Sequence, residues 1–557
     1  MEVVADGAGG GWLRQLDDAG SPAGPERRVP VLADAVARRE AEDAPRWLWA
    51  STAVAYPLLR AGTRVARCHD LELTETLLLG YAGRWGEPCA VAATLARRTG
   101  GPVPPDPPPP PARPPGEPQG SLFDLTPAGS AAGLADLATA YADQRRRIAA
   151  TAVPERFRLL VAAESAGALV AAEMGYDGLP WRADVHHRVL TDLLGPRSPA
   201  GGLPAKLARL ATAIAEALGV PGLHPDSPAE LRRAFARAGI NLPDTRAWSL
   251  RGVTHPAVPL VLEFKELYRV WTTHGWAWCD TWVHQGRFRP EYVPGGVVSG
   301  RWATRGGAAL QIPKVVRRSV VADDGWRLVV ADAGQLEPRV LAAVSSDPGL
   351  AAAAATGDLY AALAAESFDG DRARAKLALL GAMYGQTGGS ALPAITVLRQ
   401  RYPTAWRYVE QAARTGEAGG LVRSWLGRTC PPASSAWDGP GSGGGDAPDG
   451  DGPRRAAAAR SRGRFTRNFV IQATAAEWAL VLLAVLRSAL SGTRARLVFF
   501  QHDEVVVHCP EADTPAVVAA APGAATTAGK LLFGAGTVRF PLDVAAVRCY
   551  ADPTSTG

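Results

Sequence analysis

The sequence has little lysine. Only five of its 60 basic residues are lysine, and the other 55 are arginine. This imbalance, together with abundant alanine, glycine and proline, is typical of a GC-rich genome, so a single arginine carries little information. The net charge of +6 is small for 557 residues. Charge alone therefore does not favour a nucleic-acid partner.

The sequence also lacks paired cysteines and a leader segment. Its six cysteines are scattered without a Cys-x-x-Cys pair, which argues against a disulfide scaffold or a zinc site. The N-terminus has no basic start followed by an apolar core, as a signal peptide would. The most apolar long window, 469–490, contains Gln472, Glu477 and Arg487, so we interpret it as a buried helix and not a membrane span. These absences predict a cytoplasmic protein that binds no membrane.

Two segments interrupt the chain, which is long enough for two domains. Segment 101–120 is dominated by proline, so it is predicted to be a polyproline-type linker or an insertion. Segment 431–455 is rich in glycine, proline, serine and aspartate, which predicts a disordered surface loop. Between them, 155–430 has a mostly helical pattern.

Two acidic sites each follow an apolar β-prone run. The stretch "VFFQHDEVVVHCP" places Asp503 and Glu504 at a sharp turn between two such runs, and the strand "RLVVAD" ends at Asp332 before a helix that begins near Gln335. Burying carboxylates is costly unless they are paired. The pattern suggests two carboxylates at one end of a sheet, as Mg²⁺ prefers, and two such ions assist phosphoryl transfer. The alternative is that Asp332 caps a helix and Asp503 makes a turn.

Two helical stretches carry polar groups at steps of four residues. In 371–390 the shared face bears Arg372, Lys376, Leu380 and Tyr384. Such a face could bind a triphosphate, a sugar and a base in order, or it could simply be solvated.

In 464–477 the stripe is Arg464, Asn468 and Gln472 on an otherwise apolar helix. Polar groups in such a setting need partners, and nucleic-acid edges and phosphates would supply them.

These stretches resemble the three polymerase motifs of family A DNA polymerases, the bacterial DNA polymerase I family. The motifs are "VVADAGQLEPRVLAAVSSD", "RARAKLALLGAMYGQT" and "FFQHDEVVVH", in the family's order, with further likeness at 299–314 and 401–428. The resemblance covers roughly 155–550. It implies an α+β right hand, with a helical thumb at about 155–298, an antiparallel palm and helical fingers at about 299–557, and a disordered loop at about 431–460.

The resemblance also implies roles for single residues. It implies two Mg²⁺ ions held by Asp332, Asp503 and the Ala333 backbone carbonyl, with Glu504 and Lys376 completing the catalytic set. Glu337 matches the family's steric gate against a ribose 2′-hydroxyl. The implied nucleotide-binding residues are Arg372, Lys376, Leu380, Tyr384, Glu337 and Gln335, and the implied DNA contacts are Arg301, Arg464, Asn468, Gln472 and His502.

The implied reaction is template-directed addition of deoxynucleotides to a primer 3′-end, in DNA repair or replication. The implied partners are primer–template DNA and deoxynucleoside triphosphates, for a monomer associated with the nucleoid. Two other possibilities stay open. The chain could be a nucleic-acid-binding protein on a polymerase fold with reduced activity, or a polymerase that keeps a proofreading nuclease.

The chain departs from the family pattern at the nucleotide site. It has Asp332-Ala333-Gly334 where the family usually has Asp-Tyr-Ser, and Leu380 where an aromatic residue usually stands. Neither change removes a proposed metal ligand. Both changes predict weaker nucleotide binding.

Residues 1–154 resemble a shrunken 3′–5′ exonuclease domain of the α/β RNase H-like type. The strand–helix pattern is present at 47–81, but the first fifty residues contain no Asp-x-Glu and apolar Val54 stands near the expected middle aspartate. "DLE" at 70–72 comes too late, and Asp143 follows a threonine where tyrosine or histidine is expected. We interpret this part as a structural remnant without exonuclease activity, and we expect no 5′-nuclease domain.

Overall fold

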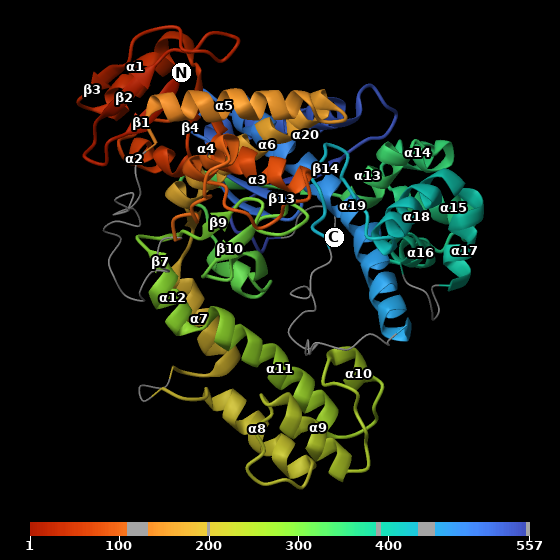
Figure 1. Cartoon of the computed structure of the whole chain (residues 1–557). Helices are drawn as coiled ribbons and strands as arrows, with labels where there is room; N and C mark the ends of the chain where they lie inside the picture. Colours follow the sequence, from red (N-terminus) through yellow and green to blue (C-terminus); the bar gives the residue numbers. More distant parts are fainter. Residues whose placement is uncertain (109–131, 198–200, 386–391, 433–451, 553–557) are drawn as a thin grey trace.

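The computed structural model describes residues 1–108, 132–197, 201–385, 392–432 and 452–552. Within these ranges the chain forms a mixed sheet near the N-terminus, a helical arm, a group of short helices and a central antiparallel sheet (Figure 1). Much of the proline-rich segment 101–120 and of the predicted loop 431–460 falls outside the described residues.

A five-stranded sheet in the order β3-β2-β1-β4-β5 forms the N-terminal part. Strand β1 is antiparallel to β2 and parallel to β4, so the sheet is mixed and the α/β character agrees with the sequence. Its kinship with exonucleases stays a prediction. The elements are β1 (Glu2–Ala5), β2 (Gly11–Arg14), β3 (Arg27–Val29), β4 (Arg46–Trp49), β5 (Arg67–Asp70), α1 (Leu32–Asp43), α2 (Ala55–Arg60), α3 (Leu71–Tyr81), α4 (Val91–Thr99) and α5 (Leu134–Ala149).

Helices α7 to α11 form an arm that projects from the body (Figure 1). The start of α9 follows from its sequence, because the Ser227 hydroxyl accepts a hydrogen bond from the Glu230 N–H at 3.4 Å and Pro228 occupies the first turn. The arm occupies the predicted thumb region. Its elements are α6 (Pro154–Asp177) at the base, α7 (Ala183–Leu194), α8 (Ala205–Ala217), α9 (Pro228–Arg237), α10 (Ala247–Arg251), α11 (Ala257–His274) and α12 (Trp276–Trp282).

The central sheet has the order β12-β13-β11-β14, and every neighbouring pair is antiparallel. Its middle strands are apolar because helices cover the sheet. Helix α20 packs against β11, β13 and β14, and α6 packs against β12. This sheet is the predicted palm. Its elements are β11 (Trp326–Ala333), β12 (Arg496–Gln501), β13 (Glu504–Pro510), β14 (Leu542–Val547) and α20 (Thr514–Phe533).

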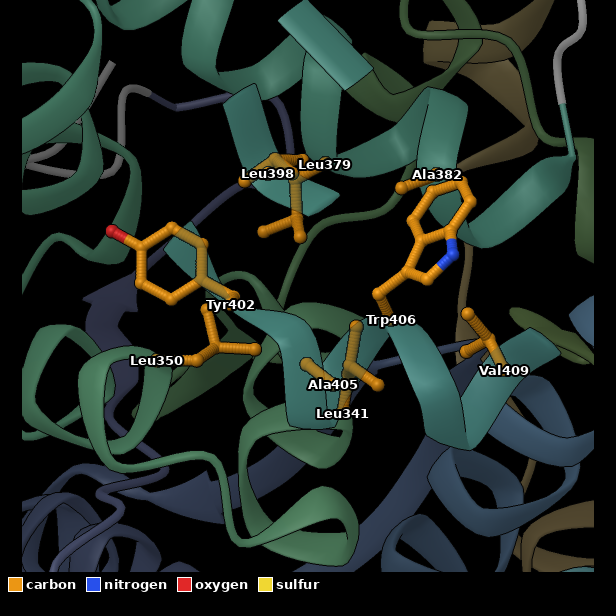
Figure 2. Close-up of a pocket in the computed structure, with 9 residues that line it drawn as sticks. All are labelled: Leu341, Leu350, Leu379, Ala382, Leu398, Tyr402, Ala405, Trp406 and Val409. Carbon is orange, nitrogen blue, oxygen red and sulfur yellow. The ribbon is translucent and has the colours of Figure 1, made fainter. Parts of the chain in front are cut away.

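A group of short helices beside the sheet forms the predicted fingers. They are α13 (Leu336–Ser345), α14 (Pro348–Ala354), α15 (Leu359–Ser367), α16 (Arg372–Tyr384), α17 (Leu392–Arg401) and α18 (Pro403–Glu417). The Asp371 carboxylate caps α16 by accepting from the Arg374 N–H at 3.0 Å, and Gly385 ends the helix in the left-handed conformation. Figure 2 shows a small apolar cavity that α16 shares with α13, α14, α17 and α18. Leu379 and Ala382 face this cavity, so it belongs to the core of the fingers.

Helix α19 (Gly452–Ala489) is the longest helix and crosses the molecule beside the sheet (Figure 1). The predicted loop at about 431–460 was wrong at its end, because 452–460 are the first turns of α19. The run "RRAAAAR" consists of strong helix formers, which explains the early start. Two helical segments, Arg455–Ala489 and Glu511–Phe533, are long and apolar enough to cross a membrane. The apolar window of the first is 78% buried, which confirms the predicted buried helix.

Hydrogen bonds with α6 and α19 join the N-terminal part to the rest of the protein. The Arg487 guanidinium makes two 2.8 Å hydrogen bonds to the Glu173 carboxylate and donates to the Ala66 carbonyl at 2.7 Å. The Ser165 hydroxyl accepts from the Asp70 N–H at 3.1 Å. These polar contacts join the N-terminal sheet to α6 and α19, which suits a supporting role.

Candidate active site

Asp332 and Asp503 meet at one end of the central sheet. Asp332 lies near the end of β11, where it is in register with Glu504 on β13, and Asp503 occupies the turn before β13. The Ala333 N–H donates to the Asp503 carbonyl at 3.1 Å. The structure therefore joins the two acidic sites that the sequence singled out.

The turn that carries Asp503 is strained. His502 has a φ of 59°, and the Asp503 N–H donates to the Gln501 carbonyl at 2.8 Å, which closes a three-residue turn. A non-glycine residue held in this region costs about 1–3 kcal/mol and persists where the surroundings fix it. Gln501 and Glu504 pair across the turn, so the hairpin supplies that support and fixes Asp503 beside β11.

The electrostatics of the pair fit a cation. Burial, together with the nearby Asp503, Glu504 and Asp543, raises the pKa of Asp332 to about 6. Burial likewise raises the pKa of Asp503 to about 6, although Arg301 opposes this rise. Two half-buried carboxylates whose ionised forms are disfavoured would be stabilised by a divalent ion.

Within the described ranges, no group of three or more His, Cys, Asp or Glu side chains is arranged to hold a metal ion. An ion at the aspartate pair would therefore need further oxygen ligands. Mg²⁺ commonly uses one or two carboxylates and completes its shell with water and substrate phosphates, and the Ala333 carbonyl is a further ligand that the resemblance implies. The residues present thus fit Mg²⁺, and the metal itself stays a prediction.

Glu504 differs from the two aspartates because its carboxylate has partners. Its Oε1 accepts from the Tyr550 hydroxyl and lies 3.6 Å from Arg317 Nη1. The sequence grouped Glu504 with the catalytic residues. That role stays a prediction, and the partners of Glu504 show that its carboxylate is held in place.

Glu337, the predicted steric gate, is fixed from two sides. It forms an ion pair with Arg301 and accepts from the Tyr384 hydroxyl at 2.7 Å. Burial and this hydrogen bond raise the pKa of Tyr384 to about 12, and a hydrogen bond with Gln472 opposes that rise. The structure thus brings together four residues that the sequence predicted from four different segments.

Gln335 is not aimed at this group. Its amide nitrogen donates to Asp358 Oδ1 at 2.7 Å, and its amide oxygen accepts from the Leu359 N–H at 2.8 Å. The predicted nucleotide contact of Gln335 remains a prediction, and in this structure both ends of its amide hold the loop before α15.

Helix α16 presents the predicted nucleotide-binding side chains. Arg372 forms a 2.8 Å ion pair with Asp358, and its side chain is 54% exposed. Lys376 is exposed, Leu380 is half-buried and Tyr384 is exposed. Lys376 has no ion-pair or hydrogen-bond partner among the residues that the structure describes. The face is available for an anion, which keeps the triphosphate prediction open.

Helix α19 carries Arg464, Asn468 and Gln472 on one stripe. Arg464 is exposed and contacts the end of α16, since a Cβ at Gly385 would lie 3.1 Å from its side chain. The Asn468 amide oxygen is buried without a hydrogen-bond partner in the described part of the chain. An unsatisfied buried acceptor is costly, so this stripe is suited to an external donor. Their DNA contacts, and that of exposed His502, stay predictions.

Sequence reasoning missed three residues around this site. Asp543 on β14 is in register with Asp332. The buried Arg339 guanidinium binds the carbonyls of Ala354 and Arg539 at 2.8 and 3.0 Å, which ties α13 to α14 and to the segment before β14. Tyr550 binds Glu504. Arg339 had a usable signal, because an arginine among apolar residues of a buried helix needs several acceptors.

The N-terminal carboxylates occupy structural positions. The Asp70 carboxylate caps α3 by accepting from the Leu73 N–H at 2.9 Å, and it also accepts from the Thr52 N–H and hydroxyl, both at 2.7 Å. Asp143 pairs with Arg146 and Arg147. Both carboxylates are engaged in structural contacts, and the loss of exonuclease activity stays a prediction.

The chain is similar to known proteins in sequence and in fold. The family model described as DNA polymerase family A matches residues 202–547, more than half of the chain. DNA polymerase I of Chloroflexus aurantiacus is 28% identical over 286 residues, covering 46% of this chain and 29% of that protein. DNA polymerase I of Deinococcus radiodurans is 26% identical over 289 residues, covering 46% and 28%. The matched part thus spans under a third of each relative.

A solved structure extends the likeness to the whole fold. The POL domain of Pol1 from M. smegmatis, in complex with DNA primer-template and dNTP, matches with a TM-score of 0.68 and 17% identity. The match covers 94% of this chain and 91% of that chain. It supports the right-hand architecture of palm, fingers and thumb.

Proposed function

Because the chain belongs to DNA polymerase family A, we propose that it extends a primer 3′-end on a DNA template with deoxynucleoside triphosphates. One observation carries this proposal. Asp332 and Asp503 come from distant segments and meet at one end of the palm sheet, and burial and neighbouring carboxylates raise the pKa of both side chains. Template-directed synthesis uses such a carboxylate pair.

Asp332, Asp503 and the Ala333 carbonyl would hold two Mg²⁺ ions, which would supply Lewis-acid activation of the primer oxygen and stabilisation of the leaving pyrophosphate. The protein's own groups do the positioning. Lys376 and Arg372 on α16 face the solvent and would bind the triphosphate. When the nucleotide binds, the Arg372 guanidinium would leave Asp358 and pair with a phosphate of the nucleotide.

The Arg301–Glu337–Tyr384 network would position the sugar of the incoming nucleotide and the primer end. Glu337 is held by two partners, so its carboxylate would keep one position beside the incoming sugar. A fixed group rejects a 2′-hydroxyl better than a mobile one, because the clash cannot be relieved by rotation. Arg464, Asn468 and Gln472 would bind the primer–template from α19.

We further propose that the N-terminal part is a support and not a nuclease, since Asp70 and Asp143 are engaged in structural contacts. We propose in addition that the protein is a monomer, that it acts on DNA in the cytoplasm, and that it does not bind a membrane. The second candidate is a DNA-binding protein with reduced activity. The changes at Ala333, Gly334 and Leu380 favour it.

Primer extension separates these possibilities. The full chain is incubated with a labelled primer–template, Mg²⁺ and all four deoxynucleotides, with parallel lanes lacking nucleotides or containing EDTA. Products that lengthen with nucleotides and Mg²⁺ support the polymerase. DNA binding without extension would favour the binding protein, and shortening of the primer without nucleotides would contradict the loss of the nuclease.

A further inference from the structure

Glu504 and Asp332 lie in one row of carboxylates. The Asp332 carboxylate has no hydrogen-bond or ion-pair partner among the residues that the structure describes, whereas the Glu504 carboxylate has two. The two residues lie opposite each other on β13 and β11, and like charges so placed destabilise a sheet. Two partners on one oxygen of the Glu504 carboxylate offset this repulsion. They are the Tyr550 hydroxyl and the Arg317 guanidinium. We refer to Arg317, Tyr550 and Glu504 as the carboxylate latch.

The latch is rigid on the side away from the aspartates. Tyr550 is 5% exposed, and its ring lies 4.3 Å from the Arg317 guanidinium carbon, a cation–π distance. Its N–H donates to the Val320 carbonyl at 2.9 Å, and its ring meets the edge of Phe499. The tyrosine hydroxyl is therefore fixed in place before any ligand binds.

We infer that Arg317 and Tyr550 are positioning residues that hold Glu504 aside, so that Asp332 and Asp503 alone offer carboxylates to the cation. The inference deepens the proposed function and rests on it. Mg²⁺ needs a near-octahedral shell and keeps sites for water and substrate phosphate. A third carboxylate in that shell would occupy a site that the nucleotide needs.

Tyr550→Phe tests the latch because it removes one oxygen and changes no charge. The measurement is Mn²⁺ binding to the full chain without DNA or nucleotide, from the free-ion signal in electron paramagnetic resonance. The freed Glu504 carboxylate adds a ligand, so Mn²⁺ should bind about fivefold more tightly, since ligand charge and number set cation affinity. Mg²⁺-dependent primer extension should fall in the same variant. A purely structural role for Tyr550 would loosen the site and weaken Mn²⁺ binding.

A double-mutant cycle assigns the effect to Glu504. In a Glu504→Gln background, Tyr550→Phe should leave Mn²⁺ binding unchanged. Tyr402→Phe is the matched control, because that hydroxyl donates to the Glu366 carboxylate at 2.9 Å in the fingers, and it should bind Mn²⁺ as the wild type does. Thermal melting shows whether each variant is folded.

Unchanged or weaker Mn²⁺ binding in Tyr550→Phe overturns the inference, and so does a tighter affinity that persists without the Glu504 carboxylate. The Mn²⁺-binding result can be distinguished from a failure of the proposed polymerase function. If the wild type failed to extend a primer but the cycle behaved as described, the latch would stand and the polymerase proposal would fall.

Discussion

Replacing Asp332, one of the two proposed catalytic aspartates, by asparagine should make this protein more stable and abolish the proposed primer extension. The pKa of Asp332 rises from an ordinary 3.8 to about 6 through burial and the neighbouring carboxylates. A rise of about two pH units corresponds to about 3 kcal/mol. Because Asp332 is only partly buried, solvent screening reduces the penalty to about 1–2 kcal/mol. Asp332→Asn removes the charge and hence this penalty.

The pH dependence gives the test its direction. Between pH 3.8 and about 6 the folded state still binds the Asp332 proton that the unfolded state has released, so stability falls as the pH rises. Above pH 6 Asp332 is ionised in both states, so its charge destabilises the folded state to the full extent. Urea or thermal unfolding in EDTA should therefore show Asp332→Asn more stable than the wild type at pH 8, with the gain gone at pH 4.

Two comparisons make the result specific. Mg²⁺ should bind the folded wild type and stabilise it, which should reduce the difference in free energy of unfolding between Asp332→Asn and the wild type. Asp324→Asn is the matched control, because the Asp324 side chain is 98% exposed and should show no such gain. A variant that is less stable at pH 8, or equally stabilised at both pH values, would refute the reasoning.

Three further predictions concern the sugar site and the N-terminal part. Leu380→Phe should lower the steady-state KM for deoxynucleotides several-fold, since a ring packed on the sugar is worth about 1 kcal/mol, and an unchanged KM would sink this idea. Glu337→Ala should relax discrimination against ribonucleotides in single-nucleotide incorporation, because it removes the bulk that Arg301 and Tyr384 hold in place. Equal discrimination would contradict the gate. A 3′-labelled primer should stay intact in Mg²⁺ or Mn²⁺, and degradation that Asp143→Ala abolishes would show an active nuclease.

Much of the end of the palm that carries the proposed site could be predicted from the sequence. Asp332 lies near the end of an apolar strand that precedes a helix, and Asp503 lies in a turn between two apolar strands, as the local patterns predict. The helix with Arg372 and Lys376 lies within the predicted stretch 371–390, where it begins after the capping Asp371 and ends at Gly385. Local rules were sufficient there because each element carries its own start and stop signals.

The partners of these residues could not be predicted, because they come from distant segments. Tyr550 reaches Glu504 only after β14 has paired with β11, and nothing in its local sequence indicates this. The start of α19 was missed because the glycine-rich composition of the preceding segment outweighed the helix-forming run that follows it. The Gln335 contacts with Asp358 and Leu359 likewise depend on how α13 and α15 pack.

We propose that Asp332 and Asp503 form the catalytic centre and are not DNA contacts. The most direct measurement compares Asp503→Ala with the wild type in Mg²⁺, with primer extension and fluorescence anisotropy on the same labelled primer–template. We expect extension to fall by at least about a hundredfold, because a lost metal ligand removes several kcal/mol of transition-state stabilisation. DNA affinity should change little, because it comes mainly from phosphate contacts. Parallel loss of binding and extension, or undiminished extension, would contradict the assignment.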